Sequence, residues 1–294
     1  MRIVSLLPSA TEIVDALGLY EQLVGVSFEC DTPPLARTDK AVVVGGLDTL
    51  GLTPSEIDAL VRTELAAGRD LYTLKAGALA GLAPDLLITQ DLCQVCALPA
   101  GQLDQALQLI GCQAEVLSLD PHRLDEVIDS VQLVARAAGV PARGDQLAAS
   151  LRARLRVVAE AVAGRPRPRV AVLEWTDPPF SAGHWVPDLV TAAGGEPVTG
   201  AAGERSVQSS WDELAAARPE LILVAPCGFH LADALDQAAS VLARLPDVPV
   251  WAIDADALVV RPGPRLVEGV EALASALHPG AMPAPPAGRI ARLR

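Results

Sequence analysis

Short apolar runs alternate with longer amphipathic stretches along most of the chain. The runs are too short for helices and are bounded by glycine, proline or aspartate, as buried strands are. They predict strands near residues 2–7, 23–27, 41–44, 85–89, 115–118, 169–174, 221–225 and 250–253. Because helical patterns lie between these runs, the sequence predicts an α/β fold.

Several helix boundaries can be located from capping residues. Residues 53–56 (Thr-Pro-Ser-Glu) have the pattern of a helix start, with proline at the first helical position, and Gly68 is a suitable stop. Residues 9–12 (Ser-Ala-Thr-Glu) match a capping box, in which Glu12 would reach back to the Ser9 amide. Amphipathic helices are expected at 124–138 and 143–163, and a last helix at about 265–277.

These elements predict two lobes. We expect an N-terminal α/β lobe over 1–141, a bridging helix over 142–163, a C-terminal α/β lobe over 164–278 and a flexible, proline-rich tail over 279–294. The segment from Leu79 to Ile88 aligns with the segment from Leu214 to Leu223, since each places proline and an acidic residue directly before an apolar run. This internal echo supports two related lobes, although chance similarity between helix ends is the alternative.

Composition limits the classes of function. With 294 residues, of which 51% are hydrophobic, the chain can form two well-packed lobes. Its formal net charge of −13 argues against nucleic-acid binding. Neither a signal peptide nor a membrane-spanning stretch is visible, so we expect a cytoplasmic protein that does not insert into membranes.

Four of the five cysteines follow predicted strands, and ligands of open α/β sheets bind at that edge. They are Cys30, Cys93, Cys96 and Cys227, and His230 follows closely as a nitrogen ligand. Together they could hold zinc or an iron–sulfur cluster. The pair Cys93-x-x-Cys96 alone fits a metal half-site, a redox pair or two buried small residues, so these three interpretations stay open.

Aromatic and charged residues gather in predicted loops and helix starts. Flat, apolar ligands favour such aromatic walls, and His184 is a candidate axial ligand or hydrogen-bond donor. Crowded carboxylates favour a metal or a cationic ligand, and the arginines could neutralise part of their charge. The candidate ligand-binding residues are Phe28, Glu29, Asp91, Glu174, Trp175, Phe180, His184, Trp185, Arg205, Trp211, Phe229 and Arg261.

Five segments resemble solute-binding proteins of the cobalamin and iron-chelate uptake class, with the cobalamin-binding proteins most similar. They are SLLPSATEIVDALGL, LVGVSFECD, LAPDLLI, GHWVPDLVTAAGGE and RPGPRLVEGVEALASALHP, and the resemblance extends over about residues 2–279. It implies two Rossmann-like lobes joined by a long helix, with the ligand held in the cleft between them. The chain departs from the family in lacking an export signal, in the insertion from Leu50 to Thr73, and in its cysteines.

The sequence therefore predicts a cytoplasmic ligand-binding protein that holds a corrinoid, similar to cobalamin, or a metal chelate. No hydrolase, kinase or dinucleotide signature indicates catalysis. One alternative is a cytosolic enzyme or a metal or redox protein that uses the cysteine cluster in the same cleft. Another is a receptor of an ABC importer with a missing leader, although the lack of an export signal argues against an ABC permease as partner.

Overall fold

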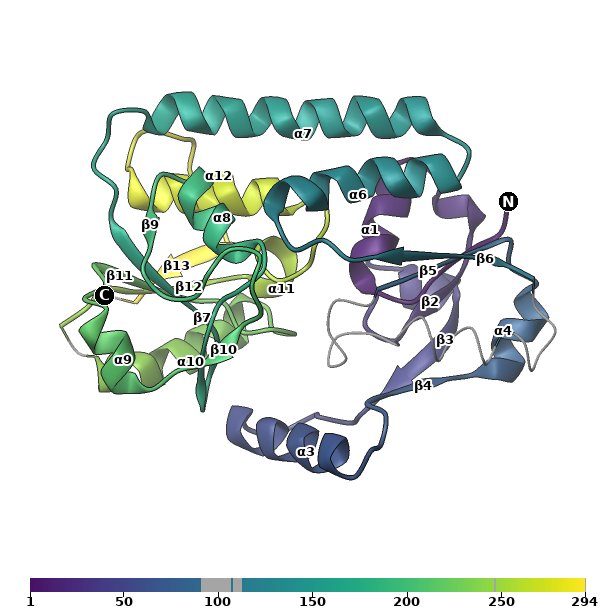
Figure 1. Ribbon diagram of the computed structural model, residues 1–294, viewed down its shortest axis with the longest axis horizontal. Helices are drawn as coiled ribbons and strands as arrows, with labels where there is room; N and C mark the ends of the chain where they lie inside the picture. Colours follow the sequence, from purple (N-terminus) through teal and green to yellow (C-terminus); the bar gives the residue numbers. More distant parts are fainter. Residues whose placement is uncertain (91–106, 108–112, 246, 294) are drawn as a thin grey trace. The chain divides into compact units, whose positions relative to one another are not determined.

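The computed structural model describes residues 1–90, 107, 113–245 and 247–293 (Figure 1). The chain divides into two compact units, each with its own sheet. The N-terminal unit comprises residues 1–121 and 128–149, and the C-terminal unit comprises 122–127 and 150–294. Among the described helices, none is long and apolar enough to cross a membrane.

The N-terminal unit is built on a six-stranded sheet in the order β4-β3-β2-β1-β5-β6. The neighbours from β3 to β6 are parallel, and β4 joins the edge antiparallel to β3. The strands are β1 (Ile3–Ser5), β2 (Leu23–Ser27), β3 (Ala41–Gly46), β4 (Tyr72–Leu74), β5 (Leu86–Gln90) and β6 (Glu115–Leu119). Shorter elements of this unit are α1 (Pro8–Ala16), the 3-10 turn η1 (Tyr20–Gln22), α2 (Ala36–Asp39) and α4 (Ala76–Leu82).

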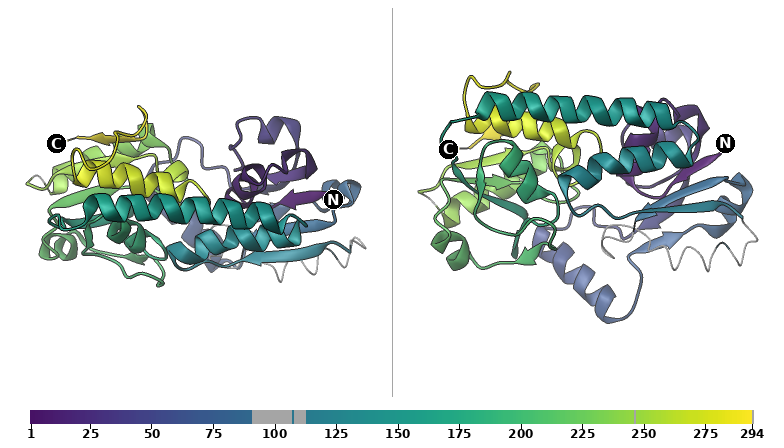
Figure 2. Two further views of the ribbon diagram at one scale, coloured as in Figure 1. Left: turned by 90° about the horizontal axis from the view of Figure 1, so that it is seen from above. Right: turned by 45° about the horizontal axis from the view of Figure 1, so that its top comes forward.

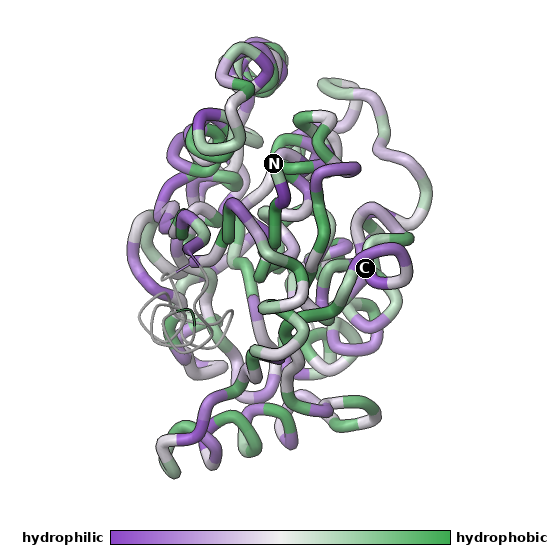
Figure 3. Tube along the Cα trace, turned by 90° about the vertical axis from the view of Figure 1, so that its right-hand side faces the viewer, coloured by the Kyte–Doolittle hydropathy of each residue, from purple (hydrophilic) through white to green (hydrophobic). Residues whose placement is uncertain are grey.

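The insertion forms α3 (Pro54–Ala66), a helix of the N-terminal unit that lies at the surface. Its capping box is present as predicted, because the Thr53 hydroxyl accepts from the Glu56 amide and the Glu56 carboxylate accepts from the Thr53 amide. No residue of α3 is buried. In Figure 3, hydrophobic and hydrophilic positions alternate along this helix at the bottom of the view. Packing against the core of the unit therefore contributes little to the stability of this helix.

The C-terminal unit contains a seven-stranded sheet in the order β10-β8-β7-β11-β12-β13, with β9 also paired to β7. Strands β7, β11 and β12 are parallel, so their carboxyl ends share one edge. The strands are β7 (Arg169–Thr176), β8 (Pro179–Ser181), β9 (Glu196–Pro197), β10 (Val207–Gln208), β11 (Leu221–Val224), β12 (Val250–Ile253) and β13 (Ile290–Arg292).

Helices cover both faces of this second sheet (Figure 1). Two of them, α9 (Trp211–Ala216) and α10 (Leu231–Arg244), place Leu214, Ala234 and Val241 in a cluster with buried residues of the central strands. The helices α8 (Val186–Ala192) and α12 (Leu266–Leu277) pack together, and α11 (Ala255–Leu258) follows β12 directly. The central strands are consequently buried, and the exposed residues of this sheet lie on the short strands β9, β10 and β13.

The internal echo between the units is confirmed at the level of contacts. A residue with positive φ precedes the proline in each copy, Ala83 at 41° and Arg218 at 48°. The acidic residue of each copy accepts the backbone amide of an arginine that precedes or begins another strand. Asp85 accepts from Arg2 at 2.6 Å, and Glu220 accepts from Arg169 at 2.8 Å. The proline and acidic residues therefore have the same function twice, which is to end a helix and align two neighbouring strands.

Two helices connect the parts of the chain. The expected helices are α6 (Leu124–Ala137) and α7 (Pro141–Val162), and Figure 2 shows α7 as one unbroken helix. Helix α7 starts two residues earlier than predicted because Pro141 is compatible with the first helical turn. Its first part belongs to the N-terminal unit and its second part to the C-terminal unit.

Two local predictions are wrong. Helix α1 begins at Pro8 with Leu7 as its N-cap, and Ser9 lies inside the helix, so the expected capping box at Ser9 does not form. Proline at the first helical position determines this start. The tail was predicted to be flexible, but residues 290–292 form β13 antiparallel to β12, because apolar Ile290 and Ala291 alongside β12 extend the sheet.

Candidate functional site

The carboxyl edge of the C-terminal sheet carries the densest group of candidate residues. Glu174 and Trp175 lie near the end of β7, Phe229 and His230 follow β11, and Asp254 follows β12. The backbone links these segments, because the Cys227 amide donates to the Glu174 carbonyl at 3.0 Å and the Asp256 amide donates to the Phe229 carbonyl at 3.2 Å. The three loops therefore form one surface.

An aromatic pair lies on this surface. The rings of Trp175 and Phe229 have centroids 5.7 Å apart and planes inclined by 45°, and both side chains are half-buried. Phe180 on β8 is opposite Trp175 in the antiparallel register. The Trp175 indole donates to the Asp177 carbonyl at 3.2 Å, which fixes the ring. The structure thus brings together three of the predicted aromatic residues.

A carboxylate and a thiol accompany these rings. The Glu174 carboxylate accepts a short hydrogen bond from the Ser206 hydroxyl, and both side chains are half-buried. Cys227 is exposed to solvent. Ser206 was not predicted, because nothing in its local sequence marks it as a partner of a residue 32 positions earlier.

The buried carboxylate of Asp254 supports His230. Asp254 Oδ1 lies 2.8 Å from His230 Nδ1 and accepts the Ala257 amide at 3.3 Å, while Oδ2 accepts from Arg289 Nη1 at 2.9 Å. The side chain of Asp254 is 8% exposed, whereas that of His230 is 53% exposed. A buried, charged group therefore holds an exposed imidazole in one orientation.

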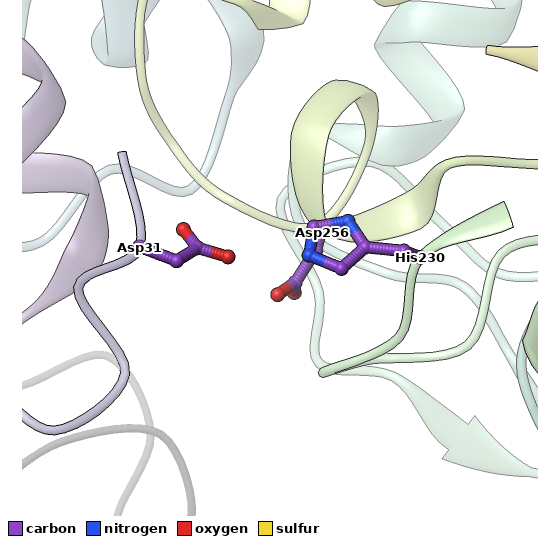
Figure 4. Close-up of side chains that lie close together, drawn as sticks. All are labelled: Asp31, His230 and Asp256. Atoms are coloured by element: carbon purple, nitrogen blue, oxygen red, sulfur yellow. The ribbon is translucent and has the colours of Figure 1, made fainter. Parts of the chain in front are cut away.

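A second carboxylate lies beside the same imidazole. Figure 4 shows Asp256 next to His230, and their ligand atoms lie within 4.8 Å of each other. Arg261 donates to Asp256 at 2.5 Å, and both side chains are largely buried. Asp31, which the figure also labels, belongs to the N-terminal unit and is described with that unit.

In the N-terminal unit, the residues after β2 are closely packed. Phe28 lies over Gly46, where an added Cβ would come within 2.3 Å of the ring. The Phe28 and Tyr72 centroids are 6.2 Å apart, and the Tyr72 hydroxyl donates to the Glu29 carboxylate at 3.3 Å. Asp31 is half-buried at the end of this segment. Phe28 and Glu29 therefore lie together, as predicted from their position after a strand.

Cys30 belongs to the interior of the N-terminal unit. It has no exposed surface, and its sulfur accepts a hydrogen bond from the Thr11 hydroxyl at 3.1 Å. The same hydroxyl oxygen lies 2.8 Å from the Ser5 hydroxyl oxygen. Burial and these contacts give Cys30 a packing position in this unit.

Four further candidates belong to the C-terminal unit. His184 and Trp185 precede α8, where the rings of His184 and His122 are 5.9 Å apart. Trp185 is 5% exposed and donates to the Val259 carbonyl at 2.8 Å. Trp211 starts α9 and lies 5.7 Å from the Arg244 guanidinium, and Arg205 is exposed in the loop before β10. In this structure Trp185 and Trp211 pack within the C-terminal unit, and their contact with a ligand stays a prediction.

The predictions for Asp91, Cys93 and Cys96 fall outside the described residues. Asp254, Asp256 and Arg289 were missed. Asp254 and Asp256 follow a predicted strand, so the rule that located His230 could have found them. Arg289 reaches this edge through β13, a pairing between distant segments that no local pattern encodes.

Comparison with known proteins gives a family. A family model described as "Periplasmic binding protein" matches residues 3–252, which is more than half of the chain. The chain belongs to this family. The resemblance to cobalamin and iron-chelate binding proteins, and the two-lobed α/β fold that it implied, are confirmed.

Three relatives illustrate the range of the family. The chain is 25% identical to the vitamin B12-binding protein of Vibrio cholerae serotype O1, over 92% of this chain and 86% of that protein. It is also 25% identical to the uncharacterized ABC transporter substrate-binding lipoprotein YvrC of Bacillus subtilis, over 95% and 80%. The structure resembles the periplasmic heme-binding protein RhuT of Roseiflexus sp. RS-1 with a TM-score of 0.67 and 25% identity, over 96% of this chain and 99% of that one.

Proposed function

We propose that this protein binds a flat metal chelate, either a corrinoid or a heme-type iron chelate, at the carboxyl edge of the C-terminal sheet. The aromatic pair Trp175 and Phe229 is the observation that supports this most strongly. Aromatic side chains bury large areas at small loss of conformational entropy and stack on flat ligands. The relatives named as vitamin B12-binding and heme-binding proteins support the same class of ligand.

The charges around the aromatic pair support a ligand that contains a metal. Asp254 and Asp256 lie beside the exposed imidazole of His230, and Glu174 adds a third carboxylate to the same edge. Arg289 and Arg261 compensate part of this charge. Carboxylate and imidazole groups suit metal-containing ligands better than simple hydrocarbons.

Titration with cyanocobalamin and with hemin tests the proposal. Binding should quench tryptophan emission, because Trp175 would lie against the ligand. Replacing Phe229 with Ala should weaken binding by roughly 1–3 kcal/mol, the usual effect of losing a buried aromatic contact. The control is Trp251→Phe on β12, since Trp251 lies on the strand rather than in the loops of this edge. No saturable binding of either compound at micromolar concentration would refute the proposal.

The cysteine alternative is a metal or redox protein that holds zinc or an iron–sulfur cluster. One observation favours this alternative. The thiol of Cys227, a possible metal ligand, is exposed at the same edge as Glu174. Elemental analysis of protein purified without added metal tests this alternative. Stoichiometric zinc or iron that is lost on replacing Cys227 with Ser would support it over chelate binding.

The expected cytoplasmic location remains part of the proposal. An exposed cysteine such as Cys227 suits a reducing compartment. Fractionation of the native cells tests the location. Recovery in the cell envelope would instead support a receptor of an ABC importer, in keeping with the relative named as a substrate-binding lipoprotein.

A further inference from the structure

We infer that the C-terminal tail controls ligand binding at the carboxyl edge of the C-terminal sheet, with Arg289 holding the buried carboxylate of Asp254 in place. Strand β13 exchanges between a paired and an unpaired state, and the ligand binds more tightly to the paired state. This inference rests on the proposed function and adds the regulation of that site. Arg289 acts through Asp254, so it is a positioning residue rather than a ligand contact.

The tail joins this edge through both backbone and side-chain contacts. Figure 1 shows β13 beside β12, and the antiparallel register places Ile290 opposite Ile253, the last residue of β12. Directly beyond this pair, the Asp254 amide donates to the Arg289 carbonyl at 2.8 Å, and Arg289 Nη1 donates to Asp254 Oδ2 at 2.9 Å. One residue of the tail is therefore bound twice to one residue of the ligand edge.

Asp254 transmits this contact to the loops of the edge. Its side chain is 8% exposed, and its Oδ1 accepts from the Ala257 amide and lies 2.8 Å from His230 Nδ1. A buried carboxylate without its cation is strongly destabilising, so it must move or take up water when Arg289 leaves. Loss of the tail should therefore disturb the residues after β11 and those after β12 together.

The attachment of the tail can open without unfolding of the unit. Strand β13 has three residues and is the edge strand of its sheet, and Leu293 beyond it packs against the core as a partly buried residue. The preceding residues 279–289 form turns and irregular structure and include four prolines. Short edge elements with few buried apolar contacts open at a low cost in free energy.

The coupling between tail and ligand must be reciprocal. If pairing of β13 raises the ligand affinity by some factor, the bound ligand favours pairing by the same factor. The Leu293 amide reports on this, because it donates to the carbonyl of Val250, which begins β12 at the end opposite the ligand edge. Ligand should therefore slow the hydrogen exchange of the Leu293 amide, an effect that direct contact with the ligand would not produce.

The first test measures the affinity of wild type and of Arg289 variants for cyanocobalamin and hemin. Arg289→Met should bind whichever probe the wild type binds roughly 5–150-fold more weakly, the usual range of coupling between two sites. Arg289→Lys should recover part of the affinity, because it restores a cation beside Asp254. Arg292→Met is the matched control, since Arg292 carries the same charge and is exposed on β13 opposite Trp251.

The second test removes the strand. A chain that ends at Ala287 lacks Arg289 and β13 together, so it should lose affinity at least as strongly as Arg289→Met. A synthetic peptide of residues 288–294, added in excess, should restore binding. Hydrogen exchange of the wild-type Leu293 amide with and without ligand needs no variant, so it decides the question even where a shortened chain does not fold.

The outcomes separate the tail from the site that it controls. Equal affinities of wild type and Arg289→Met, or an equal loss in Arg292→Met, would overturn the inference and leave the proposed function intact. Exchange of the Leu293 amide that does not change with bound ligand would do the same. Failure of wild-type protein to bind either probe would instead refute the proposed function.

Discussion

In the N-terminal unit, the residues after β2 are held by packing and by hydrogen bonds from the hydroxyl groups of Thr11 and Tyr72. In the C-terminal unit, the residues after β12 are held by ion pairs of largely buried carboxylates. Phe28 lies against Gly46, and Cys30 is enclosed with Thr11. In the C-terminal unit, Asp254 and Asp256 are bound by Arg289 and Arg261. Residues that follow the strands are therefore held mainly by packing in the N-terminal unit and mainly by ion pairs in the C-terminal unit.

The difference shows what each edge can do. Packing holds a side chain in place but also encloses it, as it does Cys30. Buried carboxylates can hold a loop and one ring nitrogen in place while about half of the side chain stays exposed, as with His230, which is 53% exposed. Ligand chemistry therefore fits the C-terminal edge better, because an exposed group is already oriented there.

The largest effect is expected from breaking the buried pair of Arg261 and Asp256. Arg261→Met should lower the free energy of unfolding by about 3 kcal/mol, because it leaves the Asp256 carboxylate in a largely buried position without its guanidinium. Urea unfolding measures this change. Arg62→Met is the matched control, since Arg62 pairs with Asp58 on the exposed helix α3, where a pair contributes at most about 0.5 kcal/mol. If Arg261→Met and Arg62→Met lowered the free energy of unfolding equally, the buried ion pair would contribute no more to stability than the exposed one.

The two cysteines should differ next most strongly in their reaction with thiol reagents. Cys227 is exposed, while Cys30 reacts only after local opening, so Cys30 should react roughly 100-fold or more slowly. Cys227→Ser should remove a fast-reacting thiol, and Cys30→Ser should remove none from the fast phase. This comparison also tests whether the cysteines act as one group. Matched protection of Cys30 and Cys227 that disappears with chelator would support a shared metal instead.

A smaller effect is expected from crowding Phe28. Gly46→Ala places a Cβ within 2.3 Å of the ring, so the ring must shift, at a cost of about 1–2 kcal/mol. Thermal unfolding measures the loss. Gly77→Ala provides the control, because no atom outside the helix lies within 4 Å of the added Cβ and alanine favours the helical conformation of α4. If both variants were equally stable, Phe28 would not be held by this contact.

Much of this comparison could be predicted, because local patterns encode local structure. Helix α3 has its stop and its capping box within its own sequence, and the echoed proline and acidic residues predicted two similar helix-to-strand turns. His230 was located by its place after a strand. The support of His230 could not be predicted, since Arg289 is 35 residues from Asp254 and reaches it only when β13 pairs with β12. The burial of Cys30 could not be predicted either, because it depends on tertiary packing around Thr11.

The smallest effect concerns the two capping boxes, one in each unit. Hydrogen bonds from the Ser210 backbone amide and hydroxyl lower the pKa of Glu213 below its ordinary 4.5, and those from Thr53 lower the pKa of Glu56 likewise. A lowered pKa in the folded state means that each carboxylate stabilises its helix above about pH 4.5 and loses this contribution as the pH falls through the folded value.

The helices should nevertheless respond differently. Helix α9 buries Leu214 in the core of the C-terminal unit, whereas α3 buries no residue. Glu213→Gln should therefore reduce the loss of global stability between pH 6 and pH 3, measured by urea unfolding against wild type. Glu56→Gln should leave global unfolding unchanged and alter only the amide hydrogen exchange of α3, because fraying of an unpacked helix is not coupled to the core. A change in global unfolding for Glu56→Gln as large as that for Glu213→Gln would show that α3 is coupled to the core of its unit, despite its exposed surface.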